Sequence, residues 1–290
     1  MSTHTAGAHA NEEMVIHSML RPQVHHAAPL HQPDVGSSSE RQKASDGASA
    51  SESDDLLFSD DAAFPVEAFG AYSSIPTVVL DDVAPSTSIT LHQRFLDDGP
   101  SVLLWNSAVS LARQWQCGGV PPPAGQRVLD LGAGLGLCAI CAAAHGAKEV
   151  VATELQGPAL DALQQSVLAN ATVAIASRLR VVELEWGERK EAQTLGTEPF
   201  DVVICADLIY NRELHGPLLR TLEAVITQGV TTLLLVFERR GHEVDAFLTS
   251  SELAFGAPLK HARDVVGPDE RNVEIHALSR LPVASGMVRR

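Results

Sequence analysis

The sequence predicts an α/β fold, in which helices cover both faces of a mostly parallel β-sheet and a disordered acidic tail precedes the domain. Three observations predict it. From residue 127 onward, apolar strand patterns alternate with helical patterns. The central strand segments, such as VVICA at residues 202–206, are continuous apolar runs, which is typical of strands covered on both faces. By contrast, residues 34–55 are rich in Ser, Ala, Gly and acidic residues and have almost no large apolar side chains.

The chain is therefore expected to divide into two parts. Residues 1–70 contain eleven acidic and three basic residues. We predict that they form a disordered tail, because so polar a segment buries too little apolar surface to offset the entropy lost on ordering. Residues 71–290 are predicted to form one folded domain.

The domain is expected to begin with two short strands and a helix. Residues 77–82 and 88–94 read as strands that could form a hairpin. Residues 103–115, LLWNSAVSLARQW, repeat apolar side chains at helical spacing. The Gly- and Pro-rich residues 118–125 then break the chain before the sheet.

Strands and helices are then expected to alternate. The predicted strands are residues 127–131, 149–155, 179–186, 200–210, 230–238 and 272–278. The predicted helices are residues 135–145, closed by Gly146, residues 157–170, with Pro158 near the first position, and residues 212–226. Parallel strands joined by right-handed helical crossovers follow from this alternation.

The stretch VLDLGAGLGLCAI at residues 128–140 joins the first of these strands to its helix through three glycines. Ligands of an open parallel sheet bind beyond the carboxyl ends of the strands, where this loop lies. A dinucleotide loop has the spacing Gly-x-Gly-x-x-Gly, but here Leu137 stands at the last position and the third glycine is Gly136. No Lys or Arg occurs between Val128 and His145 to balance a pyrophosphate. S-adenosylmethionine, which has no phosphate and carries a sulfonium cation, suits this acidic loop better, and a dehydrogenase is disfavoured.

Glu154 ends the next strand, downstream of Gly132 at the interval typical of a ribose-binding acid. A carboxylate there can accept hydrogen bonds from both ribose hydroxyls, and it excludes a 2′-phosphate. The alternative is a tight structural turn beside an exposed Glu. The order of strand, loop, helix, strand and acid favours the nucleotide site.

The composition disfavours several functions. The formal net charge of -15 is unfavourable for binding nucleic acid or an anionic membrane surface, and fits better with a basic partner or a cationic ligand. No apolar run approaches the roughly 20 residues of a membrane-spanning helix, and no secretory signal is visible. Cys138, Cys141 and Cys205 lie in apolar segments, which indicates reduced, buried thiols in a cytosolic or nuclear protein. One Cys-x-x-Cys without a second pair predicts no metal site.

Five stretches carry a resemblance to a known family. They are LLWNSAVSLARQW with its Trp-x-x-Ala, the loop VLDLGAGLGLCAI, VVATEL with its terminal acid, ELEWG, and ADLIY with its Asp-x-x-Tyr. They resemble the seven-β-strand protein-lysine methyltransferases, which include enzymes acting on Hsp70 chaperones, on the valosin-containing AAA ATPase and on elongation factors. The resemblance covers roughly residues 78–280 and implies a Rossmann-like class I methyltransferase fold with seven strands. Two features depart from the family: Glu154 stands where Asp is common, and the long acidic tail has no counterpart.

The resemblance implies cofactor contacts for seven residues. These are Trp105, Gly132, Ala133, Gly134, Glu154, Trp186 and Ala206. Core packing is the alternative for both Trp residues, although Trp186 at a strand end is well placed to stack on a purine. FERR, ending at Arg240, also resembles a family Glu-x-Arg feature. Its Glu238 and Arg239 could shape the substrate entrance or form a surface ion pair.

Asp207 and Tyr210 are the expected catalytic residues, at the carboxyl end of an apolar strand. Methyl transfer from a sulfonium mainly requires alignment of the acceptor and exclusion of water. A lysine acceptor, with a free pKa of about 10.4, must also lose a proton. Asp207 can hold the ammonium and then the amine, and Tyr210 can offer its hydroxyl or ring face. The alternatives are that Asp207 caps a helix and Tyr210 is core, and which group, if either, is the base stays open.

The predicted function is an S-adenosylmethionine-dependent N-methyltransferase that acts on a lysine of a protein substrate. The expected substrates are a chaperone, an AAA ATPase or an elongation factor, and the expected state is a monomer in the cytoplasm, with the nucleus as a second location. A methyltransferase for a small amine is one alternative. A non-catalytic cofactor-binding interaction module is the other, and the intact Asp207 and Tyr210 argue against it.

Overall fold

The structure is a computed structural model that describes residues 74–95, 102–187, 195–267 and 272–278. The predicted acidic tail, residues 1–70, lies outside the described residues. The two short strands expected at the start of the domain form an antiparallel pair, β1 (Thr77–Leu80) and β2 (Ile89–His92). Asn170 links this strand pair to the rest of the domain through two hydrogen bonds. Its side chain accepts from the Thr90 amide at 2.8 Å and donates to the Thr90 carbonyl at 2.6 Å.

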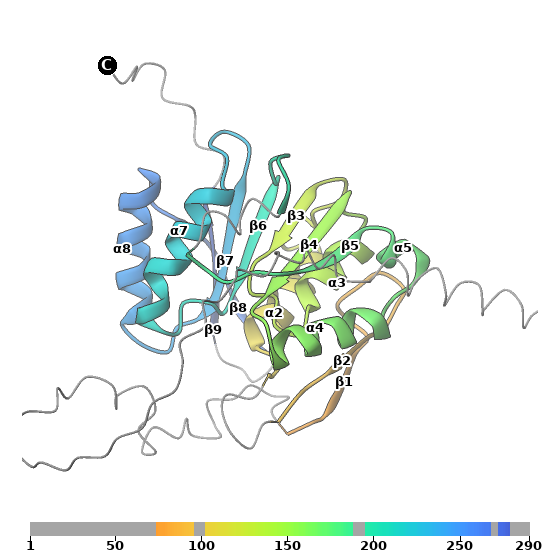
Figure 1. The fold of residues 1–290 in the computed structure, drawn as a ribbon. Coiled ribbons are helices and arrows are strands. Elements are labelled where there is room, and N and C mark those ends of the chain that lie inside the picture. The colour runs from red at the N-terminus through yellow and green to blue at the C-terminus, as the bar shows by residue number, and fades with distance from the viewer. Residues whose placement is uncertain (1–73, 96–101, 188–194, 268–271, 279–290) are drawn as a thin grey trace, which may run out of the picture. The chain divides into compact units, whose positions relative to one another are not determined.

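A seven-stranded sheet forms the centre of the fold (Figure 1). Its strands are β3 (Arg127–Asp130), β4 (Glu149–Glu154), β5 (Leu179–Glu183), β6 (Val202–Ala206), β7 (Thr232–Glu238), β8 (Lys260–Val266) and β9 (Asn272–Leu278). They lie in the order β5-β4-β3-β6-β7-β9-β8. The first five in that order are parallel, and β9 is antiparallel to both of its neighbours. The mostly parallel, seven-stranded sheet is confirmed, and the strand order reverses between β3 and β6, where ligands bind in open α/β sheets.

Helices cover both faces of this sheet (Figure 1). They are α2 (Asn106–Gln116), α3 (Leu137–Ala144), α4 (Pro158–Ala169), α5 (Val173–Ala176), α7 (His215–Val225) and α8 (Glu243–Phe255), with the short 3-10 helix η3 (Arg212–Leu214) before α7. Alternate strand residues face opposite sides of the sheet. Val128 belongs to the buried cluster that includes residues of α2, α3 and α4, whereas Leu129 belongs to the cluster that includes residues of α7 and α8. The apolar helix α3 is buried on almost all sides, since it lies between the sheet and α2.

Two predicted helix ends are confirmed, and α2 and α7 begin later than expected. Pro158 occupies the first turn of α4, and Gly146 follows α3 with a φ of 86°. The helix α2 begins at Asn106, so Trp105 is its N-cap, with an extended backbone, rather than a member of its buried face. Leu214, inside the helix predicted over residues 212–226, belongs to η3, and α7 begins at His215.

The sequence pattern did not predict α5, α8 or β8. In α8, the residues buried at helical spacing are Val244, Phe247, Ser251 and Phe255. Because Ser251 is polar, it interrupts the apolar pattern that would reveal the helix. In β8, KHARDVV, only Val265 is buried. Charged side chains cover both sides of this edge strand, so the alternation that reveals a half-buried strand is absent.

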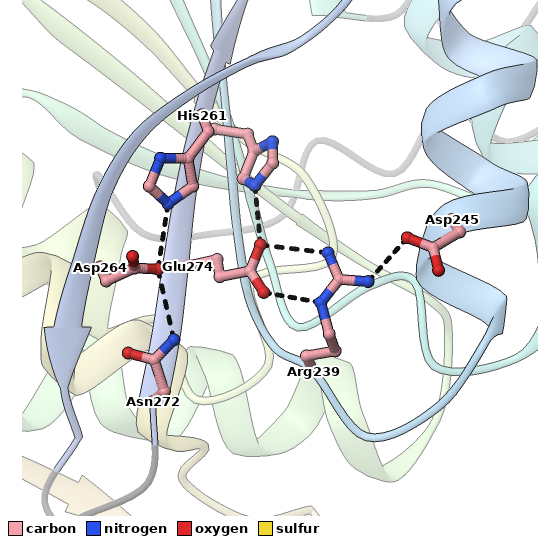
Figure 2. A network of polar contacts seen from close by, with 7 residues as sticks. Arg239, Asp245, His261, Asp264, Asn272 and Glu274 are labelled. Atoms are coloured by element: carbon pink, nitrogen blue, oxygen red, sulfur yellow. Dashed lines mark hydrogen bonds and ion pairs between the residues drawn. The ribbon is translucent and has the colours of Figure 1, made fainter.

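A network of polar contacts ties β9 to the chain beyond β7 and to α8 (Figure 2). Glu274 of β9 accepts two hydrogen bonds from Arg239, from Nε at 2.7 Å and from Nη2 at 3.2 Å. The third nitrogen of the same guanidinium donates to Asp245 of α8 at 2.7 Å, and His276 contacts Glu274 at 2.9 Å. An adjoining set completes the network: His261, Asp264 and Asn272. Arg239 therefore forms ion pairs at the surface, one of the two possibilities left by the sequence, whereas Glu238 is buried and pairs with Arg240.

The three cysteines in apolar segments are buried and unpaired, as expected: Cys138, Cys141 and Cys205. Burial raises the pKa of each of these thiols, so they are protonated packing side chains. Within the part of the chain that the structure describes, no helix has the length and apolar character that a membrane span requires.

Candidate functional site

The glycine loop after β3 needs its glycines for steric reasons. Gly132 has a φ of 61°, and a Cβ placed on it would lie 2.8 Å from the Trp186 ring and 2.9 Å from Leu208. Gly136, the N-cap of α3, has a φ of 82°, and its Cβ would lie 2.6 Å from Leu163. Any larger residue would meet both an unfavourable backbone conformation and a clash. The loop therefore places glycine backbone at the point between β3 and β6 where the strand order of the sheet reverses.

Backbone amides of this loop point to the end of β4. Ala133 donates to the carbonyl of Thr153 at 2.8 Å, and Gly134 donates to Glu154 Oε2 at 2.8 Å. The other carboxyl oxygen of Glu154 accepts from the Leu155 amide at 2.9 Å. Burial raises the pKa of Glu154, and these two backbone donors partly oppose that effect. The loop and its acid, predicted as one unit, are thus in direct contact.

Asp130 is a candidate ligand-binding residue that is not among the site residues predicted from the sequence. It is the last residue of β3 and is 2% exposed. Its Oδ2 has no hydrogen-bond partner among the described residues, and burial raises the pKa of its carboxyl to about 7. A buried acceptor without a donor is unusual, and a cation would satisfy it. The feature of the sequence that could have identified Asp130 is its place directly before the glycine loop.

Trp186 lies three residues after β5, with its ring against Gly132. It is half-buried and packs at the margin of the core that α7 and α8 form. The amide of the following Gly187 donates to Thr221 of α7 at 2.8 Å, which fixes the chain at this point. A half-buried indole beside a close-approach glycine can present a flat face to a purine.

Asp207 directly follows β6, and its surroundings contradict the capping alternative. Its backbone amide continues the sheet by donating to Val236 at 2.8 Å, and its φ of 60° is unusual for a non-glycine residue. The cap of η3 is Asn211, whose side chain accepts from the Glu213 amide at 2.9 Å. Asp207 Oδ2 instead accepts from Arg240 at 3.0 Å. An unfavourable backbone conformation held at a buried carboxyl is typical of functional sites.

The charge of Asp207 is balanced between opposing effects. Burial raises the pKa of its carboxyl, the Arg240 guanidinium lowers it, and the nearby carboxylate of Glu238 raises it further. The resulting pKa lies above the ordinary value of an Asp. Asp207 therefore depends on the guanidinium of Arg240 to keep its carboxylate ionised.

Tyr210 is 60% exposed, so the core alternative is wrong for this residue. It lies in the loop between β6 and η3. Partial burial and then the charge of Glu154 raise the pKa of its phenol. Because its pKa lies above the usual value, the hydroxyl is neutral at physiological pH.

Trp105 and Ala206 complete the predicted set. Ala206 is the last residue of β6 and is half-buried. The Trp105 ring lies under the guanidinium of Arg240, whose carbon is 5.0 Å from the ring centroid. Arg240 thus connects Trp105 to Asp207. All nine predicted residues lie at the carboxyl ends of β3, β4, β5 and β6 or in the segment before α2. Together they can hold a cationic nucleoside beside a buried acid.

Known proteins with related sequences share the central part of the chain. Residues 84–253 match a family model described as lysine methyltransferase. Protein N-lysine methyltransferase METTL21A of Danio rerio is 34% identical over 173 residues, which cover 60% of this chain and 77% of that protein. Protein N-terminal and lysine N-methyltransferase efm7 of Schizosaccharomyces pombe is 35% identical over 140 residues, which cover 46% of this chain and 54% of that protein. Calmodulin-lysine N-methyltransferase of Arabidopsis thaliana is 25% identical over 58% of this chain and 56% of that protein.

Among solved structures, SMU.776 in complex with SAH has a TM-score of 0.51 and 13% sequence identity, over 70% of this chain and 56% of that chain. At this level of identity the likeness shows the fold alone. That fold is the class I methyltransferase fold, with the strand order and the mostly parallel sheet described above.

Proposed function

This chain belongs to the lysine methyltransferase family, and we propose that Asp207 and Tyr210 receive the lysine side chain of its protein substrate. The protein is an S-adenosylmethionine-dependent methyltransferase. The observation that carries the proposal is Asp207 itself: a buried acid after β6, in a left-handed backbone conformation, next to a Leu208 that contacts the glycine loop.

The glycine loop and its neighbours fit the cofactor. S-adenosylmethionine supplies a methyl group on a sulfonium, which is already a good leaving group. We propose that Gly132, Ala133 and Gly134 lie along it and that Glu154 exchanges its bond to the Gly134 amide for the ribose hydroxyls. Trp186 covers the purine, and Trp105 and Ala206 border the same site. The unpartnered oxygen of Asp130 suits the ammonium of the methionine part.

Asp207 has the chemistry that an incoming lysine requires. Its charge attracts the ammonium into a buried position. There, the loss of hydration lowers the pKa of the lysine amine, against the opposite effect of the Asp207 charge. The proton can then pass to solvent, and the lone pair of the amine becomes available. Tyr210 lies at the exposed side, where its ring and hydroxyl can orient the amine or accept a methylammonium against the ring face.

The test is methyl labelling of a cell extract with radioactive S-adenosylmethionine and either the wild-type protein or Asp207→Asn. The wild type is expected to label a protein band in which mass spectrometry finds methyl-lysine. Asp207→Asn is expected to lower transfer about 100-fold, as for the loss of a group that positions or accepts a proton. Its affinity for S-adenosylhomocysteine, measured by calorimetry, stays unchanged because Asp207 serves the acceptor.

A matched control is Glu213→Gln, which neutralises an exposed carboxyl in η3 and should transfer as the wild type does. Tyr210→Phe keeps the ring and removes the hydroxyl, so it separates the two roles of that residue. Label found only in small molecules would favour the small-amine alternative, and label on an N-terminal amine would change the acceptor. Equal transfer by Asp207→Asn would remove Asp207 from the mechanism.

We further propose specific substrates, an oligomeric state and a location for the enzyme. The first substrates to test are an Hsp70 chaperone, the valosin-containing AAA ATPase and a translation elongation factor, each supplied unmethylated. The enzyme is proposed to act as a monomer in the cytoplasm and nucleus. Light scattering after gel filtration tests whether the enzyme is a monomer, and a fluorescent fusion in cells tests its location.

A further inference from the structure

Arg240 is a cation shared by the acceptor side and the cofactor side of the site. It lies two residues after β7 and comes to Asp207 across the boundary between β6 and β7. Its Nη2 is 3.0 Å from Asp207 Oδ2 and 3.5 Å from Glu238 Oε2. Its guanidinium carbon is 5.0 Å from the centroid of the Trp105 ring.

The two carboxylates that share this arginine are both buried. The side chains of Asp207 and Glu238 are 5% and 6% exposed, whereas that of Arg240 is 30% exposed. Asn106 at the start of α2 donates to Glu238 at 3.2 Å. Buried carboxylates keep their charge only where a cation or donors compensate for lost hydration. The face of Trp105 holds the guanidinium in the place where it meets both acids.

We propose that Arg240 is a positioning residue for methyl transfer: through its bond to Asp207 it keeps that carboxylate ionised and fixed in one orientation for the acceptor amine. This proposal rests on the role of Asp207 in the proposed function. Arg240 acts through Asp207 and takes no part in the transfer itself. Its neighbour Arg239 has a different task, because it bonds to Glu274 and Asp245.

The groups that surround Asp207 set the direction of the effect. Glu238 at the end of β7 disfavours the ionised form, whereas Arg240 and the Ser107 side chain of α2 favour it. Burial, the largest influence, raises the pKa of Asp207. If only the ionised acid attracts the ammonium, activity is lost as the pH falls through this pKa. Removal of the guanidinium charge raises that pKa, so the acid limb of the pH–rate profile moves to higher pH.

The experiment compares the wild type with Arg240→Gln, which removes the charge, and Arg240→Lys, which keeps it. The probe is the extract fraction that contains the labelled band, with radioactive S-adenosylmethionine. Initial rates at low extract concentration are measured across the pH range. We expect Arg240→Gln to lower the rate at neutral pH about 10-fold and to move the acid limb upward by about 1 pH unit or more, the effect of losing an opposite charge nearby. Arg240→Lys should return the limb close to its wild-type position.

A second readout needs no substrate. The Asp207 carboxyl resonance in carbon-13 NMR of the full chain, assigned through its absence in Asp207→Asn, should titrate at higher pH in Arg240→Gln than in the wild type. Arg239→Gln is the matched control, since it removes an equal charge one residue away and should leave both the titration and the acid limb unchanged.

The outcomes separate this inference from the proposed function. If the wild type labels no protein, the proposed function fails. If it does label protein while Arg240→Gln has a wild-type pH profile, the positioning role fails alone. Equal losses in Arg240→Gln and Arg240→Lys without any displacement of the acid limb would make Arg240 a structural residue, and would likewise overturn the proposal.

Discussion

Three carboxyl side chains at strand ends differ in what compensates for their burial. Burial raises the pKa of Asp130, Glu154 and Asp207 alike. Glu154 has two backbone amides as donors, and Asp207 has Arg240. Asp130 retains an oxygen without a partner among the described residues. The least compensated acid is therefore the one at the centre of the sheet, where a cationic ligand would have the largest effect.

Asp130→Asn is expected to stabilise the cofactor-free protein at alkaline pH and to weaken cofactor binding. Burial raises the pKa of Asp130 from 3.8 to about 7. Between these values the folded protein keeps a proton that the unfolded chain has lost, so the free energy of unfolding falls as the pH rises through this window. An Asn removes this cost, which is on the order of 4 kcal/mol at about pH 8. Urea unfolding at acid and alkaline pH measures the first effect, and calorimetry with S-adenosylmethionine measures the second.

The control for this prediction is Asp161→Asn, which changes an acid of α4 whose side chain is 62% exposed. Its effect on stability should be small at either pH. An Asp130→Asn protein that is less stable than the wild type at alkaline pH would show that the ionised carboxyl is compensated by something other than a ligand.

At the scale of elements, one arginine joins β9 and α8 to the chain directly after β7. Arg239 bonds to Glu274 of β9 and to Asp245 of α8 (Figure 2). Although Arg239 directly precedes Arg240, its partners lie on β9 and α8, outside the site. Its ion pairs are therefore expected to bear on stability and not on the surroundings of Asp207.

Glu274→Gln is expected to destabilise the protein by at most about 1 kcal/mol at neutral pH, because partly exposed ion pairs contribute little. The hydrogen bonds from Arg239 lower the pKa of Glu274, although partial burial opposes them. A lowered pKa in the folded state gives stability that is present above the unfolded value and is lost as the pH falls through the folded one. The difference between wild type and variant in thermal unfolding should therefore disappear in acid. Glu252→Gln, an exposed change in α8, serves as the comparison. A difference that persists in acid would show that the side chain acts by packing.

Elements with strong local signals were predictable, and those that depend on their neighbours were not. The helices α3 and α4 have apolar sequences with Gly146 after one and Pro158 at the start of the other, so their existence and ends follow from the chain itself. The edge strand β8 has one buried side chain, and its pairing with β9 defines it. In the site, the loop and Glu154 were found from spacing. The contact of Arg240 with Asp207, 33 residues away in the chain, appears only after folding.

At the scale of the whole molecule, the site is where separate elements become one unit. The predicted site residues come from the carboxyl ends of four parallel strands and from the start of α2. Contacts between these elements join residues far apart in the chain, such as Gly134 with Glu154 and Arg240 with Asp207. A ligand that touches all of them would link elements that otherwise meet only through the sheet, so cofactor binding should be visible in global stability.

S-adenosylhomocysteine is accordingly expected to raise the melting temperature of the wild type and to leave that of Gly132→Ala unchanged. A ligand at about 100 times its Kd adds about 2.7 kcal/mol to the free energy of unfolding, or roughly 5–10 °C for a domain of this size. In Gly132→Ala the new Cβ lies 2.8 Å from the Trp186 ring and 2.9 Å from Leu208, so both sides of the site must move. Gly118→Ala is the matched control: its φ of 75° imposes the same kind of backbone strain, but nothing lies within 4 Å of the added carbon. Differential scanning calorimetry should find both variants less stable than the wild type without ligand, and only Gly118→Ala stabilised by it. If ligand stabilises both equally, the close approach at Gly132 is not part of the cofactor site.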